Sequence, residues 1–277
     1  MPYSADISRK NPTAFLFVID QSGSMGEAWS GEKTKAQAVS DALNRLLAET
    51  ITKCSKDEGV RHYFDVGVIG YGGHGHADGL PGAGGDLLKG IPDLERTPLR
   101  VETRNMKIPD GAGGIIETTA KFPVWFDPKA SGGTPMVAAM TFAAQEIGRW
   151  CDAHPNAYPP VVIHITDGES GDGDAEPVAE VMKRLFTSDG NVLVFNLHIS
   201  SAGGSKVIFP ESETAAPTAD AKRLFRMSSL LPPLMLQAAR GKGYEVGESA
   251  RGYGYNADFV DLVSFFDIGT RPANLAR

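Results

Sequence analysis

Asp20, Ser22 and Ser24 place one carboxylate and two hydroxyls at alternate positions of the chain. They come directly after residues 14 to 19, AFLFVI, a continuous apolar run typical of a strand that is buried on both faces of a parallel sheet. Gly23 is expected to allow the tight turn that brings the three side chains together. Carboxylate and hydroxyl oxygens, completed by water, are the ligands that Mg²⁺ prefers. These residue types therefore fit Mg²⁺.

Two further oxygen-bearing side chains occupy comparable places. Thr134 follows the glycine turn at 131 to 133, and Asp167 follows VVIHI at 161 to 165, which is another apolar run typical of a buried strand. Each has an ordinary explanation on its own, since Thr134 before Pro135 suits a helix N-cap and Asp167 suits a turn. Asp20, Ser22 and Ser24 taken alone are also weak evidence for a metal site, because these residue types are common in turns. As an ordered set, however, they predict one metal site formed by Asp20, Ser22, Ser24, Thr134 and Asp167.

Strands and helices alternate along the chain in a way that places these residues at one edge of a sheet. An amphipathic helix is predicted from 33 to 53, a strand at 64 to 69, a helix opening at Thr134-Pro135 and reaching about Trp150, and a strand at 192 to 199. This alternation predicts an α/β fold with a doubly wound, mostly parallel sheet flanked by helices. Ligands of such sheets bind outside the carboxyl ends of the strands, where Asp20 and Asp167 both fall.

The remaining segments are expected to elaborate this core. The glycine-crowded stretch from 70 to 90 is predicted to be an irregular surface insertion, and 97 to 127 to hold less regular strands or a hairpin. A helix is expected to reach about Phe186, with further helices near 219 to 230, 232 to 240 and 256 to 267. We predict a tail at 1 to 12, a core at 13 to 200 with its insertion at about 70 to 130, and a helical C-terminal extension at 201 to 277 that packs on the same domain.

Three segments, FVIDQSGSMGE, SGGTPM and VVIHITDGES, resemble those that form the metal-ion-dependent adhesion site of von Willebrand factor A domains. The resemblance covers about residues 13 to 200 and implies a Rossmann-like fold. In that family, the matching side chains bind the metal directly or through water, and all five positions are present here as Asp20, Ser22, Ser24, Thr134 and Asp167. The family leaves one coordination position to water or to an acidic side chain of a partner protein.

The same resemblance gives a functional expectation. The cytosolic bacterial members of the family, including tellurite-resistance-type proteins often accompanied by kinases and phosphatases, look closer than its extracellular members. The chain is thus predicted to be a metal-dependent protein-interaction module of a bacterial cytosolic stress or defence complex, holding Mg²⁺, or Mn²⁺ or Ca²⁺. The chemistry of the residues agrees, because a dication with about two nearby carboxylates still attracts an Asp or Glu of a partner.

Two other functions stay open. Strand-terminal aspartates with Mg²⁺ serve as nucleophiles in haloacid-dehalogenase-type phosphatases, but these carry a second Asp two residues on, where this chain has Ser22. Neither a nucleophile elbow nor a phosphate-binding lysine loop occurs in the sequence, so an enzyme is not predicted. The third possibility is a scaffold that associates without using the metal. His164, inside an apolar strand, is expected to be a hydrogen-bonded core residue, and Asp172 a surface charge or helix cap.

Composition excludes further classes. The formal charge of −7 and the pI of about 5.4, without a cluster of Lys and Arg, give little support to nucleic-acid binding. The sequence contains no apolar run of about 18 residues, so no membrane span is expected. Cys54 and Cys151 lie in predicted helices and are interpreted as reduced thiols. A cytoplasmic location is therefore predicted.

Overall fold

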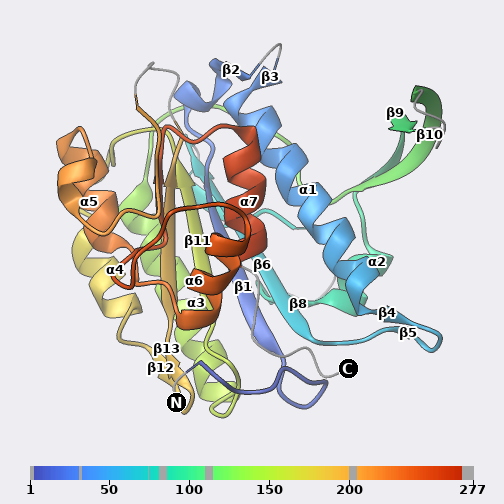
Figure 1. Ribbon diagram of the computed structural model, residues 1–277, viewed down its shortest axis with the longest axis horizontal. Helices are drawn as coiled ribbons and strands as arrows, with labels where there is room; N and C mark the ends of the chain where they lie inside the picture. The colour runs from blue at the N-terminus through green and yellow to red at the C-terminus, as the bar shows by residue number, and fades with distance from the viewer. Residues whose placement is uncertain are drawn as a thin grey trace.

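A central sheet with helices on both faces forms the body of the protein (Figure 1). The computed structural model describes residues 3–30, 33–73, 75–80, 86–109, 115–199 and 205–269 of the chain. The strands of the central sheet are β1 (Thr13–Asp20), β6 (Phe64–Gly72), β7 (Gly75–Asp78), β8 (Lys89–Gly90), β11 (Val161–Thr166), β14 (Leu193–His198), β15 (Val207–Ile208) and β16 (Tyr253–Tyr255). Their spatial order is β15-β16-β14-β11-β1-β6-β7, with β8 also paired to β6.

The sheet is mostly parallel, as predicted. β1 pairs in parallel with β6 on one side and with β11 on the other, and β14 and β16 continue the parallel arrangement, while β7, β8 and β15 are antiparallel. The chain leaves β1 through a helix to β6 and later returns to the opposite side of β1 through another helix to β11. The order of strands thus reverses at β1, and ligands of doubly wound sheets bind at such a reversal.

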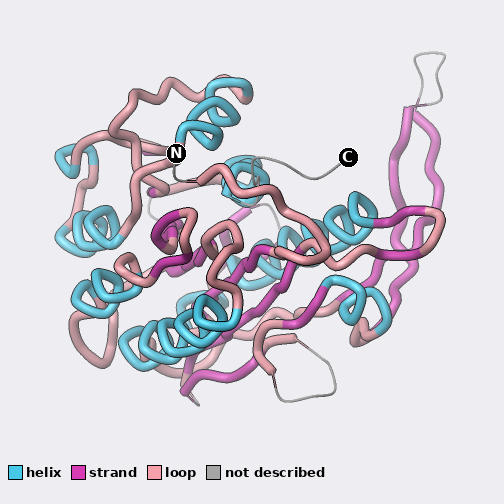
Figure 2. Tube along the Cα trace, turned by 90° about the horizontal axis from the view of Figure 1, so that it is seen from below, coloured by secondary structure: helices cyan, strands magenta, loops and turns pink. Residues whose placement is uncertain are grey.

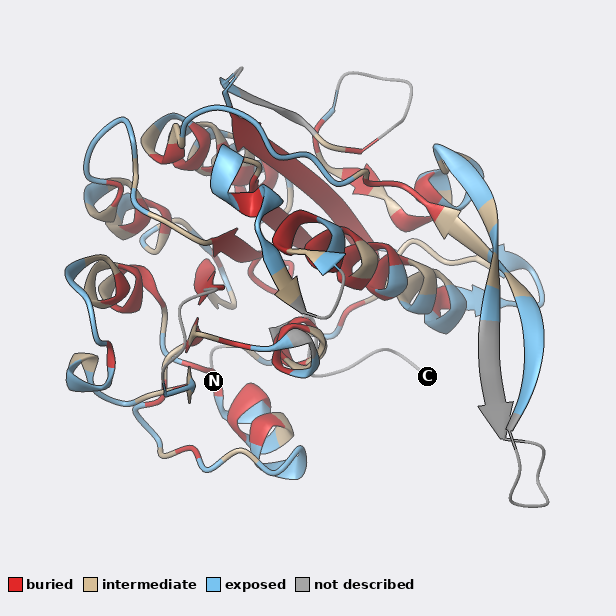
Figure 3. Cartoon of the chain, turned by 90° about the horizontal axis from the view of Figure 1, so that it is seen from above, coloured by how far each residue is buried: buried red, intermediate tan, exposed pale blue. Residues whose placement is uncertain are grey.

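Helices cover the two faces of the sheet in separate groups (Figure 1). They are α1 (Lys35–Cys54), α2 (Ile91–Arg96), α6 (Pro233–Gly241) and α7 (Phe259–Gly269) on one face, and α3 (Met136–Ala153), α4 (Glu176–Met182) and α5 (Ala219–Met227) on the other. Alternate residues of β1 serve both faces, because Phe17 packs toward α1 and α7 whereas Leu16 packs toward α3. Figure 3 shows the result, a buried central sheet between helices that are buried only on their inner sides.

Several predicted boundaries were too long. α1 begins at Lys35 rather than at residue 33, because Thr34 and Gln37 form a capping box there. α4 ends at Met182 instead of about Phe186, since Phe186–Thr187 (β12) pairs with Gly190–Asn191 (β13) in a hairpin. The other short hairpins are β2 (Ala28–Ser30) with β3 (Lys33–Thr34), and β4 (Ser55–Lys56) with β5 (Gly59–Val60). None of the described helices is long and apolar enough to cross a bilayer.

The prediction of an irregular segment from 70 to 90 was wrong at its start. β6 continues through Gly72, and β7 pairs back onto it with Gly72 opposite Gly75. A ladder uses only backbone groups, so glycine does not prevent it, and Gly75 at the start of β7 has a positive φ of 87°, which glycine adopts readily. Residues 74 and 81–85 lie outside the described residues.

The expected hairpin within 97 to 127 is an arm that projects from the body, formed by β9 (Arg100–Pro109) and β10 (Ile115–Val124) (Figure 2). Its base is held on α1 by Asn44, which is only 1% exposed. The Asn44 Oδ1 atom accepts hydrogen bonds from the backbone N–H groups of Trp125 and Phe126 at 2.8 and 3.0 Å, and its Nδ2 donates to the Phe126 carbonyl at 2.8 Å. The Asn44 side chain thereby satisfies backbone groups at Trp125 and Phe126, just beyond the end of β10.

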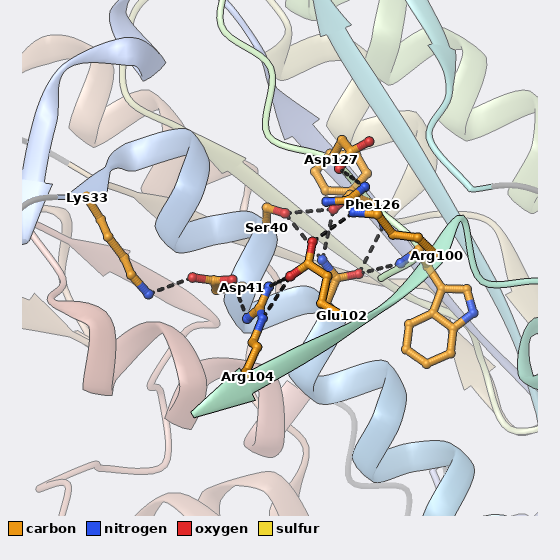
Figure 4. Close-up of polar contacts among 10 residues, drawn as sticks. Lys33, Ser40, Asp41, Arg100, Glu102, Arg104, Phe126 and Asp127 are labelled. Carbon is orange, nitrogen blue, oxygen red and sulfur yellow. Dashed lines mark hydrogen bonds and ion pairs between the residues drawn. The ribbon is translucent and has the colours of Figure 1, made fainter. Parts of the chain in front are cut away.

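Ion pairs extend the contact between the arm and α1 (Figure 4). Arg104 of β9 donates to Asp41 of α1 at 3.0 Å, and Lys33 contacts the other carboxylate oxygen of Asp41 at 2.6 Å. A cavity of about 710 Å³ lies between these elements, and its lining includes Lys33, Arg100 and Arg104. These surface pairs are partly exposed and add little stability compared with the buried Asn44 contacts.

Candidate metal centre

Three loops at the carboxyl ends of the strands are held together by backbone hydrogen bonds. The N–H of Ser131 donates to the Gln21 carbonyl at 2.8 Å, and the N–H of Gly23 donates to the Gly132 carbonyl at 2.9 Å. The N–H of Gly171 donates to the Thr134 carbonyl at 2.8 Å. The loops after β1, before α3 and after β11 therefore meet as the sequence predicted, and they do so through main-chain groups.

Close packing of the loops explains one glycine but not the one we expected. Gly132 has a φ of +68°, and a Cβ atom there would lie 2.2 Å from the Cα of Gly73. Gly23, in contrast, has no positive φ, and a Cβ atom there would make ordinary contact with Gly132 at 3.6 Å. The left-handed backbone thus occurs at Gly132, and the expectation that the tight turn relies on the conformational freedom of Gly23 was wrong.

The side chains of Ser22, Ser24 and Asp167 form a continuous chain of oxygen atoms. The Oγ atoms of Ser22 and Ser24 are 3.1 Å apart, and the Ser24 hydroxyl donates to the Asp167 Oδ1 atom at 2.8 Å. Adjacent ligands of an octahedral Mg²⁺ ion are about 2.9 Å apart, given Mg–O distances of about 2.0–2.1 Å. The observed separations lie on either side of this value. These oxygens consequently already have the mutual spacing of neighbouring ligands of a small cation.

Asp20 completes the carboxylate pair at the floor of the site. Its Oδ1 atom accepts the Ser22 backbone N–H at 2.8 Å, and its Oδ2 atom accepts the Thr166 hydroxyl at 2.7 Å. Burial raises the pKa of Asp20, hydrogen bonds from Ser22 and Thr166 lower it, and the neighbouring Asp167 raises it further, with a net increase. A buried carboxylate beside a second one is an electrostatic cost that a bound cation would remove.

Thr134 lies in the loop before α3, in a different local structure from the one predicted. α3 begins at Met136 with Pro135 as its N-cap residue, so Thr134 lies one position outside the helix. The cap comes from Asp172, whose two carboxylate oxygens each accept a backbone N–H, from Val137 and Ala138, at 2.9 Å. The expectation of a capping role for Thr134 was wrong, and the interpretation of Asp172 as a helix cap is confirmed.

Lys35 is a charged group of the site that the sequence analysis missed. Its Nζ atom lies 2.7 Å from Asp167 Oδ2 and 2.8 Å from Glu27 Oε2, and its side chain is 3% exposed. A signal for this position was present, because Lys35 stands four residues before Val39 and eight before Leu43, on the stripe of α1 that faces the core. Thr166 was missed as well, although the parallel pairing of Ile19 with Ile165 places it beside Asp20.

A buried polar chain runs beneath the carboxylates. The Tyr71 hydroxyl lies 2.7 Å from His164 Nε2, His164 Nδ1 lies 2.9 Å from Asn196 Oδ1, and Asn196 Nδ2 donates to the Ser228 hydroxyl at 2.9 Å. Since the Asn196 amide nitrogen donates to Ser228, its oxygen accepts from His164, and Tyr71 then donates to the remaining ring nitrogen. His164 is 0% exposed, which confirms it as a hydrogen-bonded core residue.

The buried imidazole makes the stability of the protein depend on pH. Burial lowers the pKa of His164 to about 4, below its ordinary value of 6.5. The unfolded state therefore binds the proton more readily, so stability falls as the pH drops from about 6.5 toward about 4, by at most about 3 kcal/mol for this group. Urea unfolding of wild type and His164→Gln across this range should show a weaker pH dependence in the variant. Equal slopes would contradict the assignment.

The donor set of the site fits a hard cation. Among the described residues, no group of three or more His, Cys, Asp or Glu side chains is placed to hold a metal ion. Two buried carboxylates with serine hydroxyls form a sparser, oxygen-only set, which suits a cation such as Mg²⁺ that keeps several waters. Ser24 and residues 131–133 are exposed above the buried carboxylates, so the site faces solvent.

Solved structures with a similar arrangement include three from different organisms. The pilus adhesin SpaC of Lactobacillus rhamnosus GG aligns at a TM-score of 0.46 and 14% identity, over 94% of this chain and 31% of its own. Manganese-loaded Plasmodium vivax TRAP protein aligns at 0.40 and 15%, over 96% and 75%. The ArnB paralog VWA2 of Sulfolobus acidocaldarius aligns at 0.38 and 12%, over 68% and 35%.

This chain therefore spans about a third of the length of the SpaC and VWA2 structures. No protein-family model and no curated protein sequence matches it. Because the TM-scores are all below 0.5, the fold assignment rests on the strand order of the chain itself. Fold and site together define an α/β protein with an oxygen-lined, hydroxyl-rich centre at the point where its strand order reverses.

Proposed function

We propose that this protein is a von Willebrand factor A-type interaction module that binds a divalent cation through Asp20, Ser22, Ser24, Thr134 and Asp167. The observation that carries the proposal is the chain of oxygens from Ser22 through Ser24 to Asp167, with separations of 3.1 and 2.8 Å. Mg²⁺ is the proposed ion, with Mn²⁺ and Ca²⁺ as alternatives, because every proposed ligand is an oxygen.

The cation is proposed to bridge to an acidic side chain of a partner protein. Asp20 and Asp167 together supply two negative charges, and the nearby Lys35 offsets one of them. A dication held by so few charges attracts a further carboxylate strongly at short range. The exposed Ser24 and residues 131–133 leave this side of the site open to a partner.

Binding rather than catalysis is the proposed activity. Ser22 stands two residues after Asp20, where a phosphatase of the haloacid-dehalogenase type carries its general acid, and the Ser22 hydroxyl contacts Ser24. His164 is the imidazole on the strand that leads to Asp167, but it is fully buried and bonded to Tyr71 and Asn196. Turnover of p-nitrophenyl phosphate with Mg²⁺, lost in Asp20→Asn, would instead support a hydrolase.

The proposed setting is a bacterial cytosolic stress or defence complex that includes a kinase or phosphatase system. This part rests on the resemblance of the three loop segments to cytosolic family members. Cys54 and Cys151 are both buried free thiols, in agreement with a reducing compartment.

Metal-dependent capture of the partner tests the proposal. Immobilised wild type and Asp167→Ala are each exposed to lysate of the source cells in Mg²⁺ and in EDTA, and retained proteins are identified by mass spectrometry. A partner retained only by wild type in Mg²⁺ is expected, and free glutamate at high concentration should release it. Identical retention under all four conditions would instead favour a metal-independent scaffold.

A further inference from the structure

Lys35 brings a positive charge to the same carboxylate that the proposed metal requires. Its Nζ atom contacts Asp167 Oδ2 at 2.7 Å and the Ser24 carbonyl at 3.4 Å, while the Ser24 hydroxyl contacts the other oxygen of Asp167 at 2.8 Å. The side chain of Asp167 is 0% exposed and that of Lys35 is 3% exposed. One buried carboxylate is thus shared between an ammonium group and the predicted metal ligands.

Lys35 remains charged in this environment. Its Nζ atom is paired with two carboxylates, Asp167 at 2.7 Å and Glu27 at 2.8 Å, and lysine carries its charge at neutral pH. Glu27 compensates the ammonium only in part, because its side chain is 56% exposed and its charge is screened by solvent. The ammonium is therefore a fixed positive charge beside the metal site.

A fixed ammonium changes the charge balance of the metal-loaded site. Asp20 and Asp167 neutralise a dication by themselves, so the charge of Lys35 is left in excess. Within a buried site two positive centres sharing one carboxylate repel each other far more strongly than they do in water. The same excess attracts an anion that binds to the metal. The ammonium of Lys35 therefore disfavours the bound cation and favours an anion that binds to that cation.

We propose that Lys35 makes the binding of the metal and the binding of an acidic ligand at this site depend on each other. The ammonium weakens the binding of the bare cation, and an arriving carboxylate relieves the excess charge and tightens the cation. By linkage, the cation raises the affinity for the carboxylate by the same factor. This inference rests on the proposed function of the site, and it adds that the metal is held firmly only together with an acidic partner.

Lys33 offers a matched control two residues away. It also pairs with one aspartate, Asp41, at 2.6 Å, but it is 54% exposed and lies on the cavity beside the arm. Lys33→Met and Lys35→Met therefore remove the same charge from the same segment. Long-range changes in net charge affect both variants, whereas only Lys35→Met removes the charge that contacts Asp167.

Titration of Mg²⁺ into the metal-free proteins, followed by calorimetry, tests the proposal. Lys35→Met is expected to bind Mg²⁺ more tightly than wild type, on the order of tenfold, and Lys33→Met to stay within about twofold. Glu27→Gln, at an exposed position, is expected to weaken Mg²⁺ binding a few-fold because it removes part of the compensation. Weaker or unchanged affinity in Lys35→Met, or an equal gain in Lys33→Met, would overturn the inference.

A measurement on the wild type keeps the test decisive if Lys35→Met does not fold. Mg²⁺ affinity is compared in acetate and in chloride at equal ionic strength, with acetate as the probe for a partner carboxylate. Acetate is expected to tighten Mg²⁺ binding to the wild type, and to do so less in Lys35→Met. Identical affinity in the two salts would contradict the coupling.

The outcomes separate this inference from the proposed function. If Mg²⁺ does not bind, or binds Asp167→Ala as well as wild type, the metal site itself is wrong. If Mg²⁺ binding requires Asp167 but neither Lys35→Met nor acetate alters it as described, the metal site stands and the role of Lys35 is refuted.

Discussion

Asp20→Asn is expected to abolish measurable Mg²⁺ binding, with a loss of affinity on the order of 100-fold or more. The change keeps the volume of the side chain but removes one of the two buried carboxylate charges that the cation needs. The metal-free variant should be at least as stable as wild type, because burial and the neighbouring Asp167 already disfavour the charged form of Asp20. Calorimetric titration and thermal unfolding, each with and without Mg²⁺, measure both effects.

Asp172→Asn is the matched control for this prediction. Asp172 follows Asp167 by five residues and carries the same charge, but it caps α3 through the N–H groups of Val137 and Ala138. Its replacement should cost about 1 kcal/mol of stability and leave Mg²⁺ affinity within about threefold. The assignment of Asp20 would be refuted by an Asp20→Asn protein whose melting temperature still rises with Mg²⁺ as in wild type.

Asn44→Leu is expected to lower the free energy of unfolding by about 3–5 kcal/mol. Leucine has a similar volume, but it leaves the buried N–H groups of Trp125 and Phe126 without a partner, whereas the Phe126 carbonyl keeps the Ser40 hydroxyl at 2.7 Å. Each buried backbone group without a hydrogen bond costs about 1–3 kcal/mol. Urea unfolding measures the loss, and proteolysis of the arm under native conditions should become faster.

Asn105→Leu provides the comparison, because Asn105 lies on β9 of the same arm and is exposed. The free energy of unfolding should change by less than about 0.5 kcal/mol there. Equal stability of Asn44→Leu and Asn105→Leu would show that the arm is not anchored by the Asn44 amide.

The parallel core could be predicted because its elements are defined by local patterns. The apolar run before Asp20 and the helical stripe through Val39 and Leu43 correspond to β1 and α1 with small errors at their ends. Predicted helix ends were wrong where a residue far away in the sequence determines the end. α3 starts after Pro135 because Asp172, in another loop, supplies its cap. The pairing of β6 with β7 runs through glycine-rich residues, so no side-chain pattern in the sequence could predict it.

The candidate site divides in the same way. Asp20, Ser22, Ser24 and Asp167 were selected by residue type and by their places after apolar runs, and the structure brings them into one hydrogen-bonded group. No hydrogen bond is described between Thr134 and that group, and the Thr134 carbonyl instead accepts the N–H of Gly171 in the loop after β11. Lys35 was missed because a lysine in a helix is ordinarily solvated, and only the tertiary structure shows that its end meets Asp167.

The arm and the candidate metal site both contact helix α1. α1 carries Lys35 at its first residue and Asn44 nine residues later, about 14 Å farther along the helix axis at about 1.5 Å per residue. Asn44 holds the base of the arm and Lys35 holds Asp167, so one helix positions both the arm and a carboxylate of the candidate site. A displacement of α1 would therefore move the base of the arm and the ammonium of Lys35 together.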